Sequence, residues 1–512
     1  MVKKRFISII AILSTFVIFV PLFYSLIEAV FENNLLNILL LNERQVILLG
    51  KSLVIGVFTG LFSTAIALPL AFLISRTNLP GRKIFNTLFI IPLLIPLYII
   101  ALAWININSF FKDFFNIYSL KGVIMVMSFG LFPIAFYLIK TGLDSMDREL
   151  EETGILMAGK FEAFRKITFP LIIPSIIVSF VFIFLLAISN FSVPACLQVN
   201  VYPVEIFSQV SAFNSFQSAI IMSLPLLFIV FVMIFSLGFL IKRKHFVPVI
   251  NEKKQGNLIN LLKWKYLCFL FCMVFSCLTL FLPVGVLLIK SLTPGAFVFA
   301  LKTSYPELIR SFVFSVTGAC FIVFIGFFIA NFRKYVEDKK KNLSETGNLN
   351  WNVYLFLLAL PVTIVGIALV KFWNRPIFSF FYKSPAIVIL AYITMFLPFG
   401  SEIIWIGLNQ INKSFEEAAF VSGADFGQTL IHILIPLLKP IIKVSWILSF
   451  IFCFGELGAS LLVTPAGMAT LPMRMYNLMH YGSSSLTCAL AVIVMLVLLL
   501  PALILFNERK II

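Results

Sequence analysis

The chain has 512 residues, of which 61% are hydrophobic and only 12% are charged, and its mean hydropathy is +1.06. Soluble domains carry about 25% charged residues, so this composition excludes an ordinary soluble protein and favours one that crosses a membrane several times. The net charge of +17 does not indicate nucleic-acid binding, because no basic face is interleaved with stacking aromatic side chains.

Twelve apolar segments are long enough to cross a bilayer as helices, which takes about 20 residues each. They lie at about 5–27, 47–75, 84–106, 121–141, 171–195, 217–241, 266–290, 308–330, 351–373, 385–409, 437–464 and 483–506. No convincing cleavage site follows the first segment, so we expect a retained span rather than a signal peptide. The sequence therefore predicts an all-α polytopic membrane protein.

The basic residues indicate how the chain is oriented. If both termini are cytoplasmic, 28 of the 39 Lys and Arg residues lie on the cytoplasmic side, as the positive-inside rule predicts. The loop at 371–383 fits least well, because Lys371, Arg375 and Lys383 fall on the outer side. We expect a multi-pass protein of the plasma membrane, or inner membrane, with both termini cytoplasmic.

The two halves of the chain resemble each other. Residues 151–174, EETGILMAGKFEAFRKITFPLIIP, align without gaps to 417–440 at an offset of 266, which matches Glu151 with Glu417 and Pro170 with Pro436. Two further alignments have an offset of 269: 201–207 with 470–476, and 89–104 with 358–373, which pairs Pro92 with Pro361 and Trp104 with Trp373.

This duplication predicts three parts: a first repeat at 1–241, a polar cytoplasmic linker at 242–265 and a second repeat at 266–512. Each half contains six predicted spans. Because six is an even number, both copies keep the same orientation in the membrane.

The second copy of the repeated loop predicts two short helices joined by a turn. Ser414 and Glu417 have the spacing of a capping box, and Asp425 and Gln428 repeat it. Gly423 is suited to the left-handed conformation that ends a helix. The neighbouring residues are small, which allows close approach of another surface; they are Ala418, Ala419 and Ala424.

The loop resembles the EAA loop of permease subunits of binding-protein-dependent, type I ABC importers. That motif has E-A-A, three residues, G-A, and later a hydrophobic residue and proline. The second copy, within 410–436, carries Glu416 before the matching residues Glu417, Ala418, Ala419, Gly423, Ala424 and Pro436. The first copy, within 142–170, keeps Glu151, Ala158, Phe164, Ile167 and Pro170.

The first copy also departs from the motif. Glu152 and Thr153 replace the two alanines, and Met157 replaces the glycine. A methionine does not favour the left-handed turn, so the turn of this copy is less clearly defined. The difference indicates unequal coupling by the two halves.

The resemblance covers nearly the whole chain, and the duplicated layout is similar to the fused permeases of ferric-iron and thiamine importers. It implies that the two loops bind two copies of a cytoplasmic ABC ATPase and that an extracytoplasmic binding protein delivers the substrate. A second permease copy is then not required. The implied function is ATP-driven import of a small solute, with ferric iron first and thiamine or another small solute as the alternative.

No motif indicates chemistry in this chain. The stretch LLGKS at 48–52 is not a P-loop, because Gln45 stands where the motif needs a glycine. The seven cysteines contain no CxxC pair, and the three histidines are scattered. We therefore expect no enzyme activity, metal or cofactor in this chain, with ATP and Mg²⁺ used by the partner ATPase.

Three polar residues in apolar segments are candidates for the translocation pathway, because a charge in mid-bilayer costs at least roughly 2.5–3.5 kcal/mol. Glu456 and Asn190 match at an offset of 266, and Glu402 has no polar counterpart. Hydrogen bonding between packed helices is the alternative interpretation. Glu402 and Glu456 also leave open a secondary transporter driven by an ion gradient.

Two other features lie outside the loops. Glu205 and Arg474 are equivalent in the repeats and opposite in charge, so they are candidates for docking the binding protein or are ordinary loop charges. The stretch GVFTG at 56–60 has GxxxG spacing, which favours close helix packing.

Overall fold

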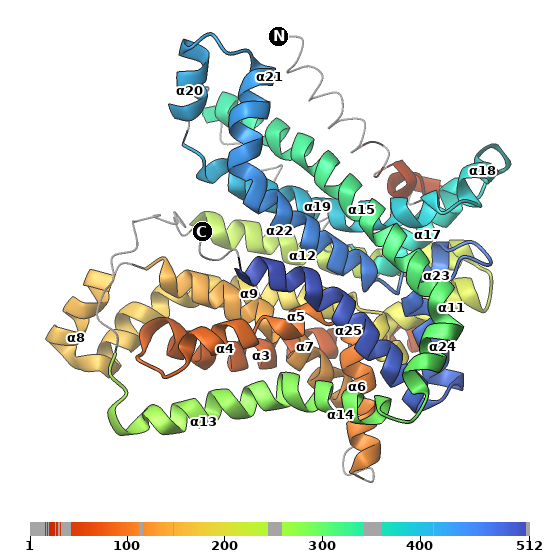
Figure 1. Ribbon diagram of the computed structural model, residues 1–512, viewed down its shortest axis with the longest axis horizontal. Helices are drawn as coiled ribbons and strands as arrows, with labels where there is room; N and C mark the ends of the chain where they lie inside the picture. The colour runs from red at the N-terminus through yellow and green to blue at the C-terminus, as the bar shows by residue number, and fades with distance from the viewer. Residues whose placement is uncertain are drawn as a thin grey trace. The chain divides into compact units, whose positions relative to one another are not determined.

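The computed structural model describes residues 42–111, 116–146, 148–243, 259–341, 360–412 and 414–507, with a few positions between 16 and 31 (Figure 1). These residues are helical throughout, apart from connections and one isolated bridge between Thr77 and Ile259. Nine of the described helices are long and apolar enough to cross a membrane, and two bent helix pairs raise the number to eleven. The all-α polytopic fold is confirmed.

One compact unit comprises Asn42–Glu205 and Phe228–Ala296. Its helices are α3 Glu43–Arg76, α4 Arg82–Leu88, α5 Ile91–Leu94, α6 Leu97–Phe110, α7 Leu120–Asp144, α8 Arg148–Ala163, α9 Phe169–Ile188, α10 Ser192–Cys196, α13 Lys265–Ser276 and α14 Leu282–Ser291.

The other compact unit comprises Met1–Leu41, Ile206–Leu227 and Phe297–Ile512. Its helices are α15 Ala296–Lys341, α17 Val362–Trp373, α18 Ser379–Tyr382, α19 Ala386–Gln410, α20 Ser414–Val421, α21 Phe426–Thr429, α22 Ile435–Phe454, α23 Ser460–Val463, α24 Leu471–Tyr481 and α25 Ser484–Asn507. Two helices, α11 Tyr202–Ser211 and α12 Phe216–Arg243, contribute residues to both units.

Eleven of the twelve predicted spans correspond to a helix or a bent pair, while the segment at 5–27 lies mostly outside the described residues. The predicted span at 84–106 is bent by 98° ahead of α6, which begins after Pro96. The structure describes residues 360–373 of the predicted span at 351–373, where α17 begins at Val362, and a bend of 99° follows ahead of Pro376, beyond the predicted end of that span. Proline lacks the N–H that continues a helix, and it disfavours helical geometry in the residue before it.

A matching irregularity marks the fifth span of each repeat. The π-helical turns Phe164–Thr168 and Leu430–Leu434 lie 266 residues apart, immediately before α9 and α22. In each, the N–H that ends the turn bonds the carbonyl five residues earlier, and the next residue is Pro170 or Pro436. Because proline donates no hydrogen bond, it interrupts the regular ladder and favours a wider turn. The repeat is thus visible in a local defect as well as in the motif.

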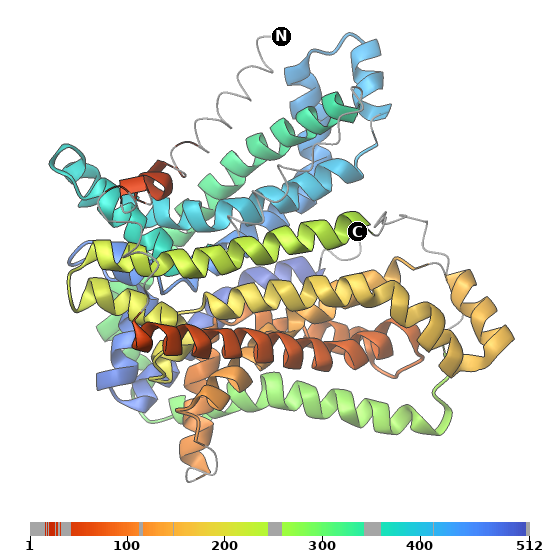
Figure 2. The ribbon, with the colours of Figure 1, turned by 180° about the vertical axis from the view of Figure 1, so that it is seen from behind.

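The predicted helix packing at 56–60 is confirmed within the first unit. A Cβ placed on Gly56 would lie 2.9 Å from the ring of Phe184, and one on Gly60 would lie 2.9 Å from the ring of Phe180. Figure 2 shows α3 and α9 side by side. The two glycines allow this approach because they have no side chain.

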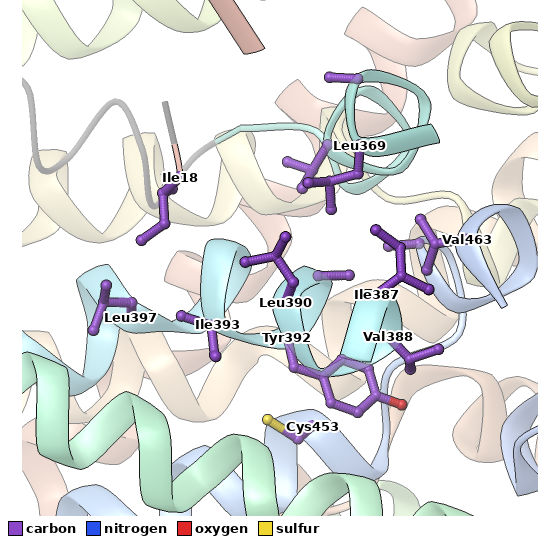
Figure 3. Packing of buried hydrophobic residues seen from close by; sticks show 14 of the residues in the cluster. Ile18, Leu369, Ile387, Val388, Leu390, Tyr392, Ile393, Leu397, Cys453 and Val463 are labelled. Atoms are coloured by element: carbon purple, nitrogen blue, oxygen red, sulfur yellow. The ribbon is translucent and has the colours of Figure 1, made fainter. Parts of the chain in front are cut away.

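The core of the second unit gathers buried side chains from α17, α19, α22 and α23 (Figure 3). Tyr392 is at its centre, 1% exposed. Two cations of the loop at 371–383, which fits the positive-inside rule least well, have partners within this unit. Lys371 pairs with Glu28 at 3.2 Å, and the Arg375 guanidinium lies 4.4 Å from the ring centroid of Tyr24.

Candidate functional site

The second repeated loop forms the helix–turn–helix that its sequence predicts. Helix α20 ends at Val421, Gly423 has a φ of +78°, and α21 begins at Phe426. The predicted capping box at the start of α21 is confirmed: Gln428 N–H donates to Asp425 Oδ1 at 2.7 Å, and Asp425 N–H donates to Gln428 Oε1 at 2.8 Å. Figure 1 shows α20 and α21 at one end of α22.

The cap of α20 differs from the prediction. Asn412 Oδ1 accepts from Ser414 N–H at 3.1 Å, two residues before the expected cap. An asparagine side chain serves an N-terminal N–H as well as serine does. Within the segment, Glu417, Ala418, Gly423 and Val421 are exposed, whereas Ala419 is buried.

The first repeated loop turns at a different residue. Helix α8 continues through Met157 and Ala158, and the break falls at Gly159, with φ 80° and ψ 167°. This conformation is open almost only to glycine, so the turn moves along the chain to the next available glycine. The exposed apolar side chains around it are Leu156, Met157 and Phe161.

Glu151 is held inside the chain. Its Oε2 lies 3.1 Å from Arg76 Nε, and its Oε1 accepts a hydrogen bond from Thr168 Oγ1 at 3.1 Å. The same arginine donates from Nη2 to the carbonyl of Leu143 at 2.7 Å. The side chains of Arg76 and Glu151 are 3% and 8% exposed. This glutamate is therefore part of the internal structure of the first segment.

In the second repeat the ion pair involves a different glutamate. Lys334 Nζ lies 2.9 Å from Glu416 Oε1 and donates to the carbonyl of Leu408 at 3.2 Å. Glu417, which the alignment matches with Glu151, is exposed. The paired carboxylate is thus shifted by one residue between the two copies.

Glu402 does have a charged partner. Arg333 Nη1 lies 2.6 Å from Glu402 Oε2, and the guanidinium lies 3.7 Å from the ring centroid of Trp405. The pair joins α15 to α19 near the end of α19 that leads into α20. The predicted span at 308–330 ends before Arg333, whereas α15 continues to Lys341 and brings Arg333 beside Glu402.

Asn190 and Glu456 occupy equivalent turns just after α9 and α22. Asn190 Oδ1 accepts from Val193 N–H at 3.0 Å. Glu456 Oε1 accepts from Ala459 N–H at 2.8 Å, and Oε2 accepts from the N–H and hydroxyl of Ser460 at 2.9 Å and 2.6 Å. Glu456 lies two residues beyond the end of α22 at Phe454, although the predicted span at 437–464 includes it. Both side chains close the turn that follows a long helix.

The two residues proposed for docking lie on equivalent helices, α11 and α24. Glu205 pairs with Arg44 at 2.9 Å, and its side chain is 11% exposed. Arg474 is half-buried. The helices are also anchored alike: Tyr202 N–H donates to Ser52 Oγ at 2.9 Å, and Leu471 N–H donates to Ser311 Oγ at 2.6 Å.

The candidate spans and the two matching loop segments define the chain as a polytopic membrane protein with an internal repeat. The family described as "Binding-protein-dependent transport system inner membrane component" matches residues 63–246 and again 323–508. The chain belongs to this family and carries its domain twice, which confirms the resemblance to type I ABC importer permeases and the internal duplication.

Several curated proteins are similar over nearly the whole chain. The "Putative ferric transport system permease protein FbpB 1" of Haemophilus influenzae is 24% identical over 88% of this chain and 75% of its own length. The "Ferric transport system permease protein FbpB" of Actinobacillus pleuropneumoniae is 24% identical over 90% of this chain and 70% of its own length.

A shorter relative matches about half of the chain. The "Putative 2-aminoethylphosphonate transport system permease protein PhnV" of Salmonella typhimurium is 28% identical over 43% of this chain and 85% of its own length. A protein of about one repeat in length is thus similar to part of this chain, as a fused duplication predicts.

Proposed function

We propose that this chain is the membrane-spanning permease of an ATP-driven importer whose substrate is ferric iron. The presence of two family domains in one chain, each with its own loop segment, carries the proposal. The names of the relatives that match almost the full chain support iron, while the name of the one-repeat relative shows that this family is not restricted to it.

The loop segments within 142–170 and 410–436 would each bind one copy of a cytoplasmic ATPase. ATP and Mg²⁺ belong to that partner, and this chain binds no cofactor. The exposed apolar side chains of the two segments, Leu156 and Met157 in the first and Val421 in the second, support this role, because exposed apolar surface often marks a site of protein binding.

The transport cycle would alternate access between the two sides of the membrane. ATP-driven closure of the ATPases draws the two segments together, and the helical bundles reorient with them. A substrate-loaded binding protein shifts this equilibrium only through different affinities for the two states. With the loop segments on the cytoplasmic side, both termini are also cytoplasmic. The membrane is then the plasma or inner membrane, and Glu205 and Arg474 face the binding protein.

Ferric-iron uptake by the reconstituted transporter tests the substrate and the energy source. Permease, ATPase and binding protein are placed in proteoliposomes, and ⁵⁵Fe(III) accumulation is measured with ATP, with a non-hydrolysable analogue, and with an ion gradient alone. Uptake is expected only with ATP. Uptake driven by the gradient alone would show a secondary transporter, and ATP-dependent uptake of thiamine in place of iron would reassign the substrate.

Glu456 and Asn190 remain the pathway candidates, with Glu402 less favoured because Arg333 already pairs with it. Glu456→Gln keeps the shape of the side chain but replaces one of its two acceptor oxygens by an NH2 group, so it can no longer accept from all three of its donors. If the residue lines the pathway, uptake per folded transporter should change in rate or in its preference among metal ions. If it only closes the turn, stability should fall and uptake per folded transporter should not.

A further inference from the structure

Among the described residues, each repeat has a cation that joins three elements. In the first, Arg76 at the end of α3 contacts the Leu143 carbonyl near the end of α7 and Glu151 of α8. In the second, Lys334 of α15 contacts the Leu408 carbonyl near the end of α19 and Glu416 of α20. We call these sets the first anchor (Arg76, Leu143, Glu151) and the second anchor (Lys334, Leu408, Glu416).

The anchors occupy the same place in the architecture of both repeats. Three residues separate α7 from α8, and three separate α19 from α20. The last carbonyls of a helix carry a partial negative charge, so a cation is stabilised where a helix ends. A cation that contacts both this carbonyl and a carboxylate on the following helix therefore fixes the angle across the short connection.

We propose that Arg76 and Lys334 are positioning residues that transmit movement of the loop segments to the transmembrane helices. Without the anchors, a three-residue connection is free to bend, and displacement of α8 or α20 is lost in the connection. With them, α8 moves together with α3 and α7, and α20 moves together with α15 and α19. The inference rests on the proposed function, because it needs an ATPase to displace the segments.

The two anchors differ in exposure, which predicts unequal strength. In the first anchor the side chains are 3% and 8% exposed, and Thr168 also donates to the carboxylate. In the second anchor they are 11% and 30% exposed. Water screens the second ion pair more strongly. The first repeat should therefore transmit movement more rigidly than the second.

The test compares Arg76→Gln and Lys334→Gln in the complete transporter with its ATPase and binding protein. Lys140→Gln is the matched control, since it removes an ion pair with Asp144 that lies within α7 alone. The measured quantities are ATPase bound per permease, the ratio of ATP hydrolysis with loaded binding protein to basal hydrolysis, and uptake per assembled transporter.

Arg76→Gln should retain the ATPase but lower the stimulation ratio and uptake at least tenfold, and Lys334→Gln should lower both about threefold. Arg76→Lys should restore at least half of the lost stimulation, because it restores the charge. Lys140→Gln should stay within twofold of the unmodified protein. If Arg76→Gln does not fold, the more exposed Lys334 gives the result, since its loss costs the fold less.

Stimulation within twofold of the unmodified protein in the folded anchor variants would overturn the inference. Loss of bound ATPase from those variants would overturn it as well, because the cations would then shape the docking surface rather than transmit movement. Failure of the unmodified chain to bind the ATPase would instead refute the proposed function, so the two failures are distinguishable.

Discussion

Glu151 and Glu417 occupy equivalent positions in the two repeats, yet Glu151 is buried against Arg76 whereas Glu417 is exposed. One sequence motif thus supplies an internal ion pair in the first repeat and an exposed carboxylate in the second. The same type of substitution should consequently affect stability at one position and partner binding at the other.

Reversing the charge of Glu417 should weaken binding of the ATPase. Glu417→Lys places a cation on an exposed face of α20, so it should change the free energy of unfolding by no more than about 0.5 kcal/mol and lower co-purified ATPase and uptake at least tenfold. Glu43→Lys, an exposed substitution at the start of α3, is the control. Full ATPase binding by Glu417→Lys would remove the role proposed for this residue.

Removing Glu151 should destabilise the protein much more than removing Glu416. Glu151→Ala leaves the buried Arg76 without its carboxylate, which costs about 3–5 kcal/mol. Glu416→Ala breaks a pair whose carboxylate is 30% exposed, and the cost should be within about 1 kcal/mol. Thermal or denaturant unfolding in detergent measures both. Equal costs would contradict the difference in burial.

A side chain at Gly60 should separate α3 from α9. A Cβ there would lie 2.9 Å from the Phe180 ring and 3.2 Å from the Phe180 carbonyl oxygen, so Gly60→Val should cost about 1–3 kcal/mol by overpacking. Gly50→Ala in the same helix meets no atom within 4 Å and should be neutral or stabilising. Unfolding measurements on the pair check this, and equal stability would argue against close packing.

The two loop turns should each require glycine. Gly159→Ala and Gly423→Ala place a side chain at φ values of 80° and 78°, which costs roughly 1–2 kcal/mol each. Both should reduce uptake, and protease cleavage near the altered turn should increase. Gly285→Ala in α14, where φ is not positive and no atom lies within 4 Å, is the control. An unaffected Gly159→Ala would show that the first turn forms elsewhere.

The helical, multi-span architecture followed from the sequence, because long apolar runs are a strong signal. The helix–turn–helix around Gly423 was predicted because a glycine and the Asp425–Gln428 box lie at its turn. The position of the first turn was harder to predict, because Met157 stands where the second copy has Gly423 and the motif does not say which other residue forms the turn. The structure shows that Gly159 does.

The partners of the charged residues could not be read from spacing. Arg76 and Glu151 are 75 residues apart, and Arg333 and Glu402 are 69 apart, so only the packed helices bring them together. Apolar alignments were also ambiguous: Pro361 was matched with Pro92, but it begins α17 as Pro96 begins α6. Repetitive apolar sequence fits several registers equally well.

The turn of the first loop segment, at Gly159, lies two residues later than the position that matches Gly423. A shift of two residues along a helix corresponds to about 3 Å and a rotation of about 200°. If the proposed ATPase partner is a two-fold symmetric dimer, it would therefore meet two unlike surfaces on one polypeptide, and its two halves would lose their equivalence on binding. A single substitution or label in this chain addresses one half alone, which a permease built from two identical chains does not allow.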